Sequence, residues 1–316
     1  MKRVLWILIF VAAGILGHEA ANMKYQLNAT LSLMDRDSEM DLSEVDVSED
    51  TLLSEDKIVN ILLVGADKRA YWSQKGRSDS VMIATIDMKH KELKLTSLMR
   101  DMYVEIPGYQ NAKFNAAYSY GGISLLYQTI AQNFGIKLDG YVIVDFEAFK
   151  NVINTIGGVD VELTQAECDY LLKTYAGKKT SILKLQPGLN KMNGTQALAY
   201  TRIRQDARGD FGRTQRQRNV LNAIFQEAKS MSLSELKGLA EGVLPCVVTD
   251  VTNDEVVSYL MSVIMMGTTD IEQLRIPIDN GYTQDRINGQ AVLVVDWDVN
   301  RQALQDFIFQ SSKESN

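Results

Sequence analysis

The stretch Ile58-Val59-Asn60-Ile61-Leu62-Leu63-Val64-Gly65 decides the fold, because it is an almost unbroken apolar run that ends in glycine. A strand that is apolar at successive positions is covered on both faces, as in α/β proteins whose sheet lies between two helical layers. The residues that follow such a strand lie at the sheet edge where α/β proteins present functional side chains. Asp67 stands at this point and is therefore a candidate functional residue.

Strands and helices alternate after this run, and no repeat or long linker separates them. We therefore predict one α/β domain over residues 57–310, a three-layer α/β/α sandwich with a mixed central sheet, followed by a tail at 311–316. Periodicity predicts further strands at 80–87, 93–98, 140–145, 159–163 and 274–278. It predicts helices at 116–134 (interrupted by Gly121-Gly122), 146–156, 193–200, 213–231, 233–243, 253–266 and 299–309.

The N-terminus has the pattern of an export signal. Lys2 and Arg3 precede an apolar run of residues 4–17, which is short for a span of about 20 residues and fits a signal-peptide core. The basic pair favours a cytoplasmic N-terminus, so we predict a retained signal anchor over residues 1–22, with cleavage near Ala20-Ala21 as the alternative. Residues 23–56 carry a net charge of −8 and are predicted to be an acidic extracytoplasmic linker.

Composition excludes several classes of protein. The chain has a net charge of −7, so the acidic linker leaves the rest close to neutral. With two histidines, His18 and His90, a Ser-His-Asp hydrolase or a His-ligated zinc site is nearly excluded. The two cysteines, Cys168 and Cys246, are too few for a disulfide framework and are predicted to be buried thiols, with a single bridge as the alternative.

Charged residues lie at the ends of three successive predicted strands. Asp67 follows the first strand, Arg77 and Asp79 open the second, and Arg100-Asp101 follows the third. Each alone is typical of a turn cap or a surface ion pair, but together they are expected to meet at one sheet edge. Carboxylates there could hold Mg²⁺, which proteins bind through one or two carboxylates and the phosphates of a substrate.

A run of six arginines without a lysine falls within residues 202–218. The planar guanidinium group matches the geometry of phosphate oxygens, so the run indicates a site for a phosphorylated ligand. Arg202 and Arg204 share a face if the chain is extended there, whereas Arg213, Arg216 and Gln217 share a helical face. A solvated basic helix is the alternative, and a nucleic-acid partner is excluded by the nearly neutral body and the pI of 5.1.

The order of these motifs resembles the LytR–CpsA–Psr family, strongly over residues 57–230. The motifs are Leu63-Val-Gly-Ala-Asp67, Arg77-Ser-Asp79-Ser, Ser97-Leu-Met-Arg100-Asp101, Lys113-Phe-Asn-Ala-Ala-Tyr118, Gly157-Gly-Val-Asp160-Val, Leu185-Gln-Pro-Gly188, Gln196-Ala-Leu-Ala-Tyr200-Thr-Arg202-Ile-Arg204 and Asp210-Phe-Gly-Arg213-Thr-Gln-Arg216-Gln217. Several separated motifs in the right order are far more specific than any one of them.

Members of this family are membrane-anchored phosphotransferases that move glycopolymers, such as teichoic acid or capsular polysaccharide, from a polyprenyl-pyrophosphate carrier to peptidoglycan. The resemblance implies the same activity here, with Mg²⁺ as cofactor and an extracytoplasmic domain anchored in the membrane of a Gram-positive type of bacterium. Asp67 and Asp79 match the acids near Mg²⁺. The catalytic assignments are Asp67, Asp79, Arg100, Asp101, Arg202 and Arg204. The substrate-binding assignments are Arg77, Arg100, Lys113, Arg202, Arg204, Arg213, Arg216 and Gln217, whereas Arg208 and Arg218 are expected to be solvated.

Two other functions stay open at this point. Water could replace the sugar acceptor, which would make the protein a pyrophosphatase of the same carrier, or the chain could be a non-catalytic envelope regulator that binds polyprenyl phosphates. The general base is Asp101 or one of the acids beside the metal. The apolar tail of the carrier requires a channel between the sheet and the helices.

Overall fold

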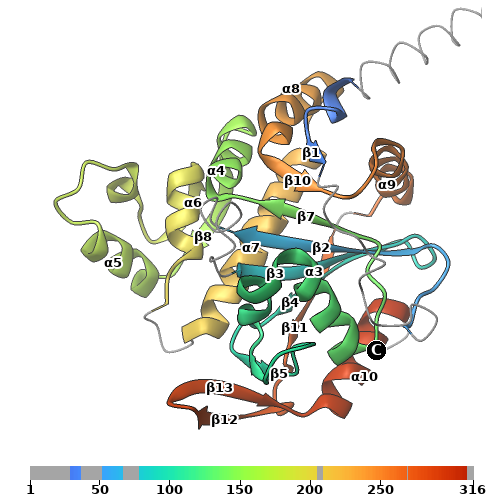
Figure 1. Cartoon of the computed structure of the whole chain (residues 1–316). Coiled ribbons are helices and arrows are strands. Elements are labelled where there is room, and N and C mark those ends of the chain that lie inside the picture. The colour runs from blue at the N-terminus through green and yellow to red at the C-terminus, as the bar shows by residue number, and fades with distance from the viewer. Residues whose placement is uncertain (1–28, 37–51, 67–77, 205–208, 269, 312–316) are drawn as a thin grey trace, which may run out of the picture.

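A seven-stranded mixed sheet forms the centre of the molecule (Figure 1). The computed structural model describes residues 29–36, 52–66, 78–204, 209–268 and 270–311. The strands lie in the order β1 (Asp35–Arg36), β10 (Val247–Thr249), β7 (Gly140–Val144), β2 (Ile58–Ala66), β3 (Ser78–Asp87), β4 (Glu92–Leu98) and β11 (Ile271–Ile276). Strand β2 pairs antiparallel with β3 and parallel with β7, so the sheet is mixed, as predicted.

The apolar run that opens the domain is a central strand covered on both faces. Leu62 and Val64 are buried in the main core, whereas the alternate residue Ile61 is buried on the other face. The main core joins the sheet to α3 (Asn115–Phe134) and α10 (Trp297–Phe309). Helix α3 contains the predicted interruption, with non-helical backbone at Gly121 and Gly122.

The long helix α7 (Gly209–Lys229) covers the opposite face of the sheet. Its Gln215 and Arg218 side chains both donate hydrogen bonds to Gln273 on β11. Gln273 is registered with Leu95. Leu98 belongs to the core that faces α3, and Leu95 lies three residues before it on the same strand. Side chains alternate along a strand, so Leu95 and Gln273 point to the opposite face of the sheet, where α7 lies. The three-layer α/β/α arrangement is therefore confirmed.

A second core lies beyond α7 and holds α4 (Phe146–Thr155), α5 (Gln165–Thr174), the 3₁₀ helix η3 (Ser181–Lys184) and α6 (Gly194–Thr201). A two-stranded sheet of β8 (Val159–Leu163) and β9 (Gly188–Met192) closes it. The remaining elements are α8 (Leu233–Val243), η4 (Leu244–Cys246), α9 (Asn253–Met266) and a four-stranded sheet ordered β12 (Tyr282–Ile287), β13 (Gln290–Val295), β5 (Met102–Val104) and β6 (Ala112–Lys113).

Part of the predicted linker belongs to the fold, which corrects its reading as a solvated segment. Strand β1 pairs parallel with β10, and Leu31 and Met34 are buried in a third small core. Leu52 joins the main core before the predicted domain start. The sequence signal for this packing is the set of apolar residues spaced through the acidic stretch. The high net charge of the stretch conceals that signal. Within the described ranges, no helix has the length and apolar character needed to cross a membrane.

The predicted helices and strands before residue 270 agree with the structure within a few residues, but several short elements were missed. The strand expected at 274–278 lies at Ile271–Ile276, and the 282–295 hairpin was not predicted. Both cysteines are free thiols, as predicted, but Cys246 is only partly buried.

Candidate functional site

The carboxyl end of β2 meets the beginning of β3 and the end of β7 at one edge of the sheet. Ala66 is registered with Ser78, and Gly65 with Val144. Asp67 and Arg77 lie outside the described residues, and of Asp79 only the backbone is described, at a register shift in β3. The backbone thus brings the two chain segments that carry the predicted metal ligands to adjacent places.

Two oxygen donors from neighbouring strand ends suit Mg²⁺, which prefers carboxylate oxygens and completes its coordination with waters or phosphates. The donor set at positions 67 and 79 fits this preference. No group of three or more His, Cys, Asp or Glu side chains that could hold a metal occurs in the described ranges, which leave Asp67 out. Mg²⁺ at this edge stays a prediction.

Asp210 holds two arginines from different elements in one place. Its Oδ1 accepts a hydrogen bond from Arg100 Nη2 at 3.2 Å, and its Oδ2 accepts one from Arg213 Nη2 at 2.9 Å. Arg100 follows β4, whereas Asp210 lies in the first turn of α7 and Arg213 comes three residues later on the same side of the helix. An acid in a first helical turn is also favoured by the helix dipole. The pair of arginines is therefore fixed at the sheet edge before any ligand binds.

A second ion pair extends this cluster toward β6. Lys113 Nζ donates to Asp101 Oδ1 at 2.7 Å, and Arg100 Nε lies 3.8 Å from Asp101 Oδ2. Three cations thus share two carboxylates, so the cluster of Arg100, Asp101, Lys113, Asp210 and Arg213 carries one excess positive charge. Arg100, Asp101 and Lys113 are each 20–26% exposed, which leaves them accessible to a ligand. We call this group the charged cluster.

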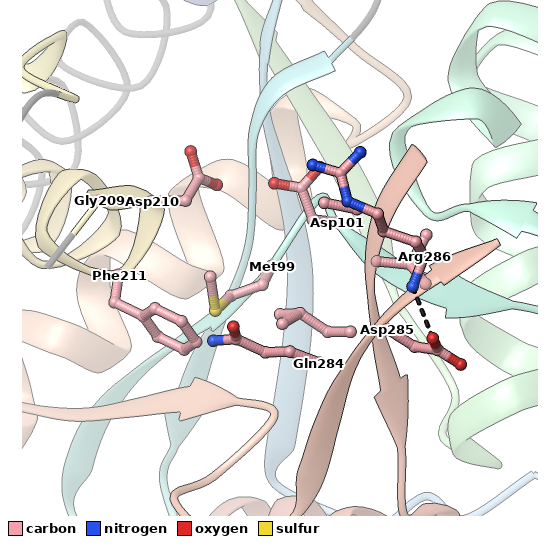
Figure 2. Close-up of a pocket in the computed structure, with 11 residues that line it drawn as sticks. Met99, Asp101, Gly209, Asp210, Phe211, Gln284, Asp285 and Arg286 are labelled. Carbon is pink, nitrogen blue, oxygen red and sulfur yellow. Dashed lines mark hydrogen bonds between the residues drawn. The ribbon is translucent and has the colours of Figure 1, made fainter. Parts of the chain in front are cut away.

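A cavity of about 840 Å³ opens beside the charged cluster. Figure 2 shows Asp101 and Asp210 at its margin, Met99 and Phe211 along it, and Gln284, Asp285 and Arg286 on the β12–β13 hairpin. Phe211 is stacked on Tyr282 and also lies beneath the Arg275 guanidinium, at 4.5 Å from its ring centroid. The cavity therefore combines charged groups from the charged cluster and the hairpin with aromatic and apolar side chains.

Arg202 and Arg204 lie on the surface with the buried Ile203 between them. Arg202 is the C-cap of α6, with helical rather than extended backbone, so the assumed extended conformation is wrong although the shared exposure remains. Its guanidinium lies 4.1 Å from the ring centroid of Phe146, which begins α4 directly after β7. The end of β7 is at the same sheet edge as the end of β2, so Arg202 belongs to this region.

Arg216 is not placed to bind a substrate. Its side chain is 1% exposed, its Nε donates to Glu167 Oε1 at 2.7 Å, and its Nη1 donates to the Ile203 carbonyl at 3.1 Å. Burial acts to raise the pKa of Glu167, but hydrogen bonds from Thr164 and Arg216 hold that pKa below its ordinary value. The assignment of Arg216 to the ligand is therefore corrected to a structural role. Gln217, its neighbour, is half-buried.

Arg218 also differs from the sequence-based expectation. It was expected to be solvated, but it is buried, and its Nε donates to Gln273 Oε1 at 3.2 Å. Desolvation, with Arg275 nearby, lowers the pKa of Arg218 to about 10. Arg208 lies outside the described residues.

Two parts of the site were not assigned from the sequence. Asp210 was quoted in a motif but given no role, although its spacing of three residues from Arg213 at a predicted helix start was a signal for an ion pair. The lining residues of the β12–β13 hairpin carried no chemical signal of their own. Their contribution depends on the pairing of β13 with β5, which brings residues about 190 positions apart together.

Comparisons with known proteins agree with this geometry. The model of the LytR_cpsA_psr family matches residues 20–306. The regulatory protein MsrR of Staphylococcus aureus is 32% identical over 255 residues, covering 79% of this chain and 74% of MsrR. The polyisoprenyl-teichoic acid–peptidoglycan teichoic acid transferase TagU of Bacillus mycoides is 33% identical, covering 80% of this chain and 81% of TagU. A structure of TagT bound to LIIa-WTA superposes with a TM-score of 0.66 at 26% identity, covering 82% of this chain and 95% of TagT.

Proposed function

The chain belongs to the LytR–CpsA–Psr family, and on that premise we propose that it transfers a glycopolymer from a polyprenyl-pyrophosphate carrier to peptidoglycan. The observation that carries the proposal is the charged cluster, in which Asp210 holds Arg100 and Arg213 together at the sheet edge. Two arginines in a fixed position suit the two phosphates of a pyrophosphate. The similarity to TagU, named as a teichoic acid transferase, supports the same reading.

In the proposed reaction a hydroxyl oxygen of peptidoglycan forms a bond with the phosphorus atom that carries the glycopolymer. The bond from this phosphorus to the bridging oxygen breaks, polyprenyl phosphate leaves, and the hydroxyl proton passes to a base. Negative charge on the phosphoryl oxygens and the leaving phosphate is stabilised by cations placed in advance. In the charged cluster Arg100, Arg213 and Lys113 are suited to this role, and the exposed Arg202 and Arg204 are suited to it as well. Asp101 and Asp210 are engaged by these cations and act as positioning residues, so we assign the base that accepts the proton to one of the other acids predicted for it, Asp67 or Asp79.

The proposal includes Mg²⁺, held by Asp67 and Asp79 at the ends of neighbouring strands. When bound there, Mg²⁺ would neutralise charge on the pyrophosphate oxygens. The register of Ala66 with Ser78 supports this placement of the two acids.

We place the apolar tail of the carrier between the sheet and α7. On that face the buried residues Ile61, Met82 and Leu95 do not belong to any of the three hydrophobic cores. At the end of the sheet opposite to the carboxyl end of β2 lies α9 (Figure 1). No residue of α9 is buried, and Leu260, Met261, Ile264 and Met265 are exposed. An apolar tail that starts at the charged cluster would extend along the sheet toward this helix.

We also place the domain outside the cytoplasmic membrane, anchored by the apolar run of residues 4–17. Residues 18–28 separate this run from the first described helical turn, which packs beside β10. A short connection keeps the domain close to the membrane in which the lipid carrier resides.

Transfer is tested by incubating the full-length chain with a labelled polyprenyl-pyrophosphate glycopolymer and peptidoglycan. We expect the label to become attached to peptidoglycan and polyprenyl phosphate to be released. Release of free glycopolymer phosphate with no label on peptidoglycan would instead identify a pyrophosphatase, and binding without turnover would identify a regulator.

Alanine at Arg202 or Arg204 should lower the affinity for a polyprenyl pyrophosphate by one to two orders of magnitude. The loss of one charge-assisted hydrogen bond costs about 1.5–3 kcal/mol. Lysine at Arg202 should restore the affinity only partly, because it keeps the charge but loses the planar fork and the stacking on Phe146. Binding is measured at fixed ionic strength with Arg208→Ala as the matched control. Equal losses in all three alanine variants would indicate a diffuse basic surface.

Serine at both Leu260 and Ile264 should weaken the binding of a long-chain polyprenyl pyrophosphate at least tenfold. Burying one such side chain against an apolar tail contributes about 1.5–3 kcal/mol to the free energy of binding, and this contribution is lost when the residue is serine. A pyrophosphate with only two isoprene units should bind as before, because its tail cannot reach α9. Leu189→Ser, at a residue 73% exposed on β9, is the matched control. An equal loss of affinity for the long-chain and the two-isoprene pyrophosphate would refute the proposed position of the lipid tail.

A further inference from the structure

A second pocket, of about 370 Å³, lies beyond the charged cluster between the β5–β6 connection, the start of α3 and the turn of the β12–β13 hairpin. Lys113 lines it, and the same Lys113 is paired with Asp101 in the margin of the large cavity. Val292 lines both spaces. The pocket is therefore adjacent to the site where the phosphates are proposed to bind, so a chain-like ligand bound in the pocket lies close to the charged cluster.

Two exposed tyrosines form one wall of this pocket. The rings of Tyr109 and Tyr120 are stacked, with centroids 5.0 Å apart and an interplanar angle of 25°, yet the residues are 52% and 48% exposed. Tyr120 directly precedes the interruption of α3, where Gly122 has a φ of +66° that other residues rarely adopt. Each ring has a face that is not covered by the other, and neither ring belongs to a core cluster. The pair therefore offers an aromatic surface to a ligand.

Amide side chains surround the tyrosines. Gln110, Asn111, Asn288 and Gln290 line the pocket, are exposed, and make no side-chain hydrogen bond to another described residue. Each amide carries two donors and an acceptor, so together they can bind hydroxyl and acetamido groups without a charged partner. The only charged side chain of the pocket lining is Lys113, and Asp101 offsets its charge.

A separate pocket has a charge that suits an anionic polymer better. This pocket, of about 320 Å³, is lined by Lys150, Lys178, Lys179 and Arg202 and by no acidic side chain. Charge complementarity therefore favours an anionic polymer in that basic pocket and an uncharged chain in the pocket lined by Tyr109 and Tyr120.

We propose that the tyrosine pocket, formed by Tyr109, Tyr120 and the four amides, binds the uncharged glycan chain of the acceptor, whose sugars carry acetamido groups. This inference rests on the proposed transfer to peptidoglycan. A sugar ring presents an apolar C–H face to the tyrosine ring and polar groups at its margin to the amides. The glycan is then held with one of its hydroxyl groups directed along Lys113 toward the charged cluster.

The test uses the full-length chain with two probes, an uncharged hexamer of N-acetylglucosamine and intact peptidoglycan glycan strands, whose lactyl carboxylates stay bound in the amide link to the stem peptide. We expect Tyr109→Ala/Tyr120→Ala to weaken glycan binding at least tenfold and to raise the KM for the glycan acceptor similarly, with little change in kcat. Tyr109→Phe/Tyr120→Phe should retain most of the affinity, since the ring faces remain. Leu189→Ala, at an apolar residue that is even more exposed than the two tyrosines, should match the wild type.

Polyprenyl pyrophosphate binding, measured in parallel, should be the same in the wild type and in the alanine variant. Unchanged glycan affinity and KM in the alanine variant would overturn the inference and leave the transferase proposal standing. Displacement of the glycan by the isolated stem peptide would overturn it as well, because the pocket would then recognise peptide. A wild-type chain that binds the glycan through the tyrosines but transfers nothing would refute the transferase proposal alone.

Discussion

Replacing Asp79 with alanine should abolish transfer from the lipid carrier while the domain stays folded. Asp79 lies in β3 beside the end of β2, where it and Asp67 are proposed to hold Mg²⁺. Loss of one preorganised electrostatic group of an active site costs roughly 10²–10³-fold in rate, and loss of a divalent cation removes more charge than that. The arginines of the charged cluster remain in Asp79→Ala, so the variant should still bind the carrier, though more weakly.

Metal binding should be measured directly as well, because a loss of turnover alone does not show that a metal ion has been lost. Binding of Mn²⁺, a paramagnetic substitute for Mg²⁺, should be seen by electron paramagnetic resonance in the wild type and lost in Asp79→Ala. Asp160→Ala is the matched control, because this acid is 53% exposed on β8, away from the charged cluster. Full transfer in the presence of EDTA would refute the metal site.

The fold could be predicted well where local signals and burial agree. The bounds predicted for α8 and α9 match the structure, because each helix begins with a capping box, Ser232 with Glu235 and Thr252 with Glu255. The β12–β13 hairpin was missed although its Asn288-Gly289 turn, with positive φ at both residues, is a recognised hairpin signal. Strand β12 is largely polar and exposed, so apolar periodicity could not find it, whereas the mostly apolar and partly buried β13 carried a signal that was overlooked.

The parts of the candidate site that depend on residue type and on order along the chain could be predicted from the sequence. The sequence correctly brought Arg100 and Asp101 to the sheet edge, since both follow a buried strand. It could not distinguish Arg213 from Arg216, which occupy one helical face three residues apart. Both arginines are buried, and their partners separate them. Arg216 is paired with Glu167 on α5, 49 residues before it, whereas Arg213 is paired with Asp210 in the charged cluster.

This difference leads to the second large effect, which concerns stability. Arg216→Ala should destabilise the domain by about 3–5 kcal/mol, because it leaves the Glu167 carboxylate buried without its partner. The Ile203 carbonyl also loses its donor, and the guanidinium is removed from beside the Tyr200 ring. Arg213→Ala should cost less stability but should weaken carrier binding, since Asp210 keeps Arg100 and remains partly exposed. Urea unfolding and carrier binding, measured on both variants, therefore separate a structural arginine from a ligand-binding one.

The pH dependence of unfolding gives an independent check on the same ion pair. Because the folded state lowers the pKa of Glu167 below its ordinary value of 4.5, the pair contributes its stability above that value and loses it as the pH falls through the folded-state pKa. The stability gap between the wild type and Glu167→Gln should therefore be constant near neutral pH and shrink only in acid below about pH 4.5. Carrier binding by Glu167→Gln should be unchanged at neutral pH, since Glu167 is hydrogen-bonded to Thr164 and to Arg216, the arginine with the structural role. Two results would contradict the structural role of Arg216 and favour its assignment to the phosphate site. One is a stability difference between the wild type and Glu167→Gln that stays constant into strong acid. The other is a loss of carrier binding in Glu167→Gln equal to that in Arg213→Ala.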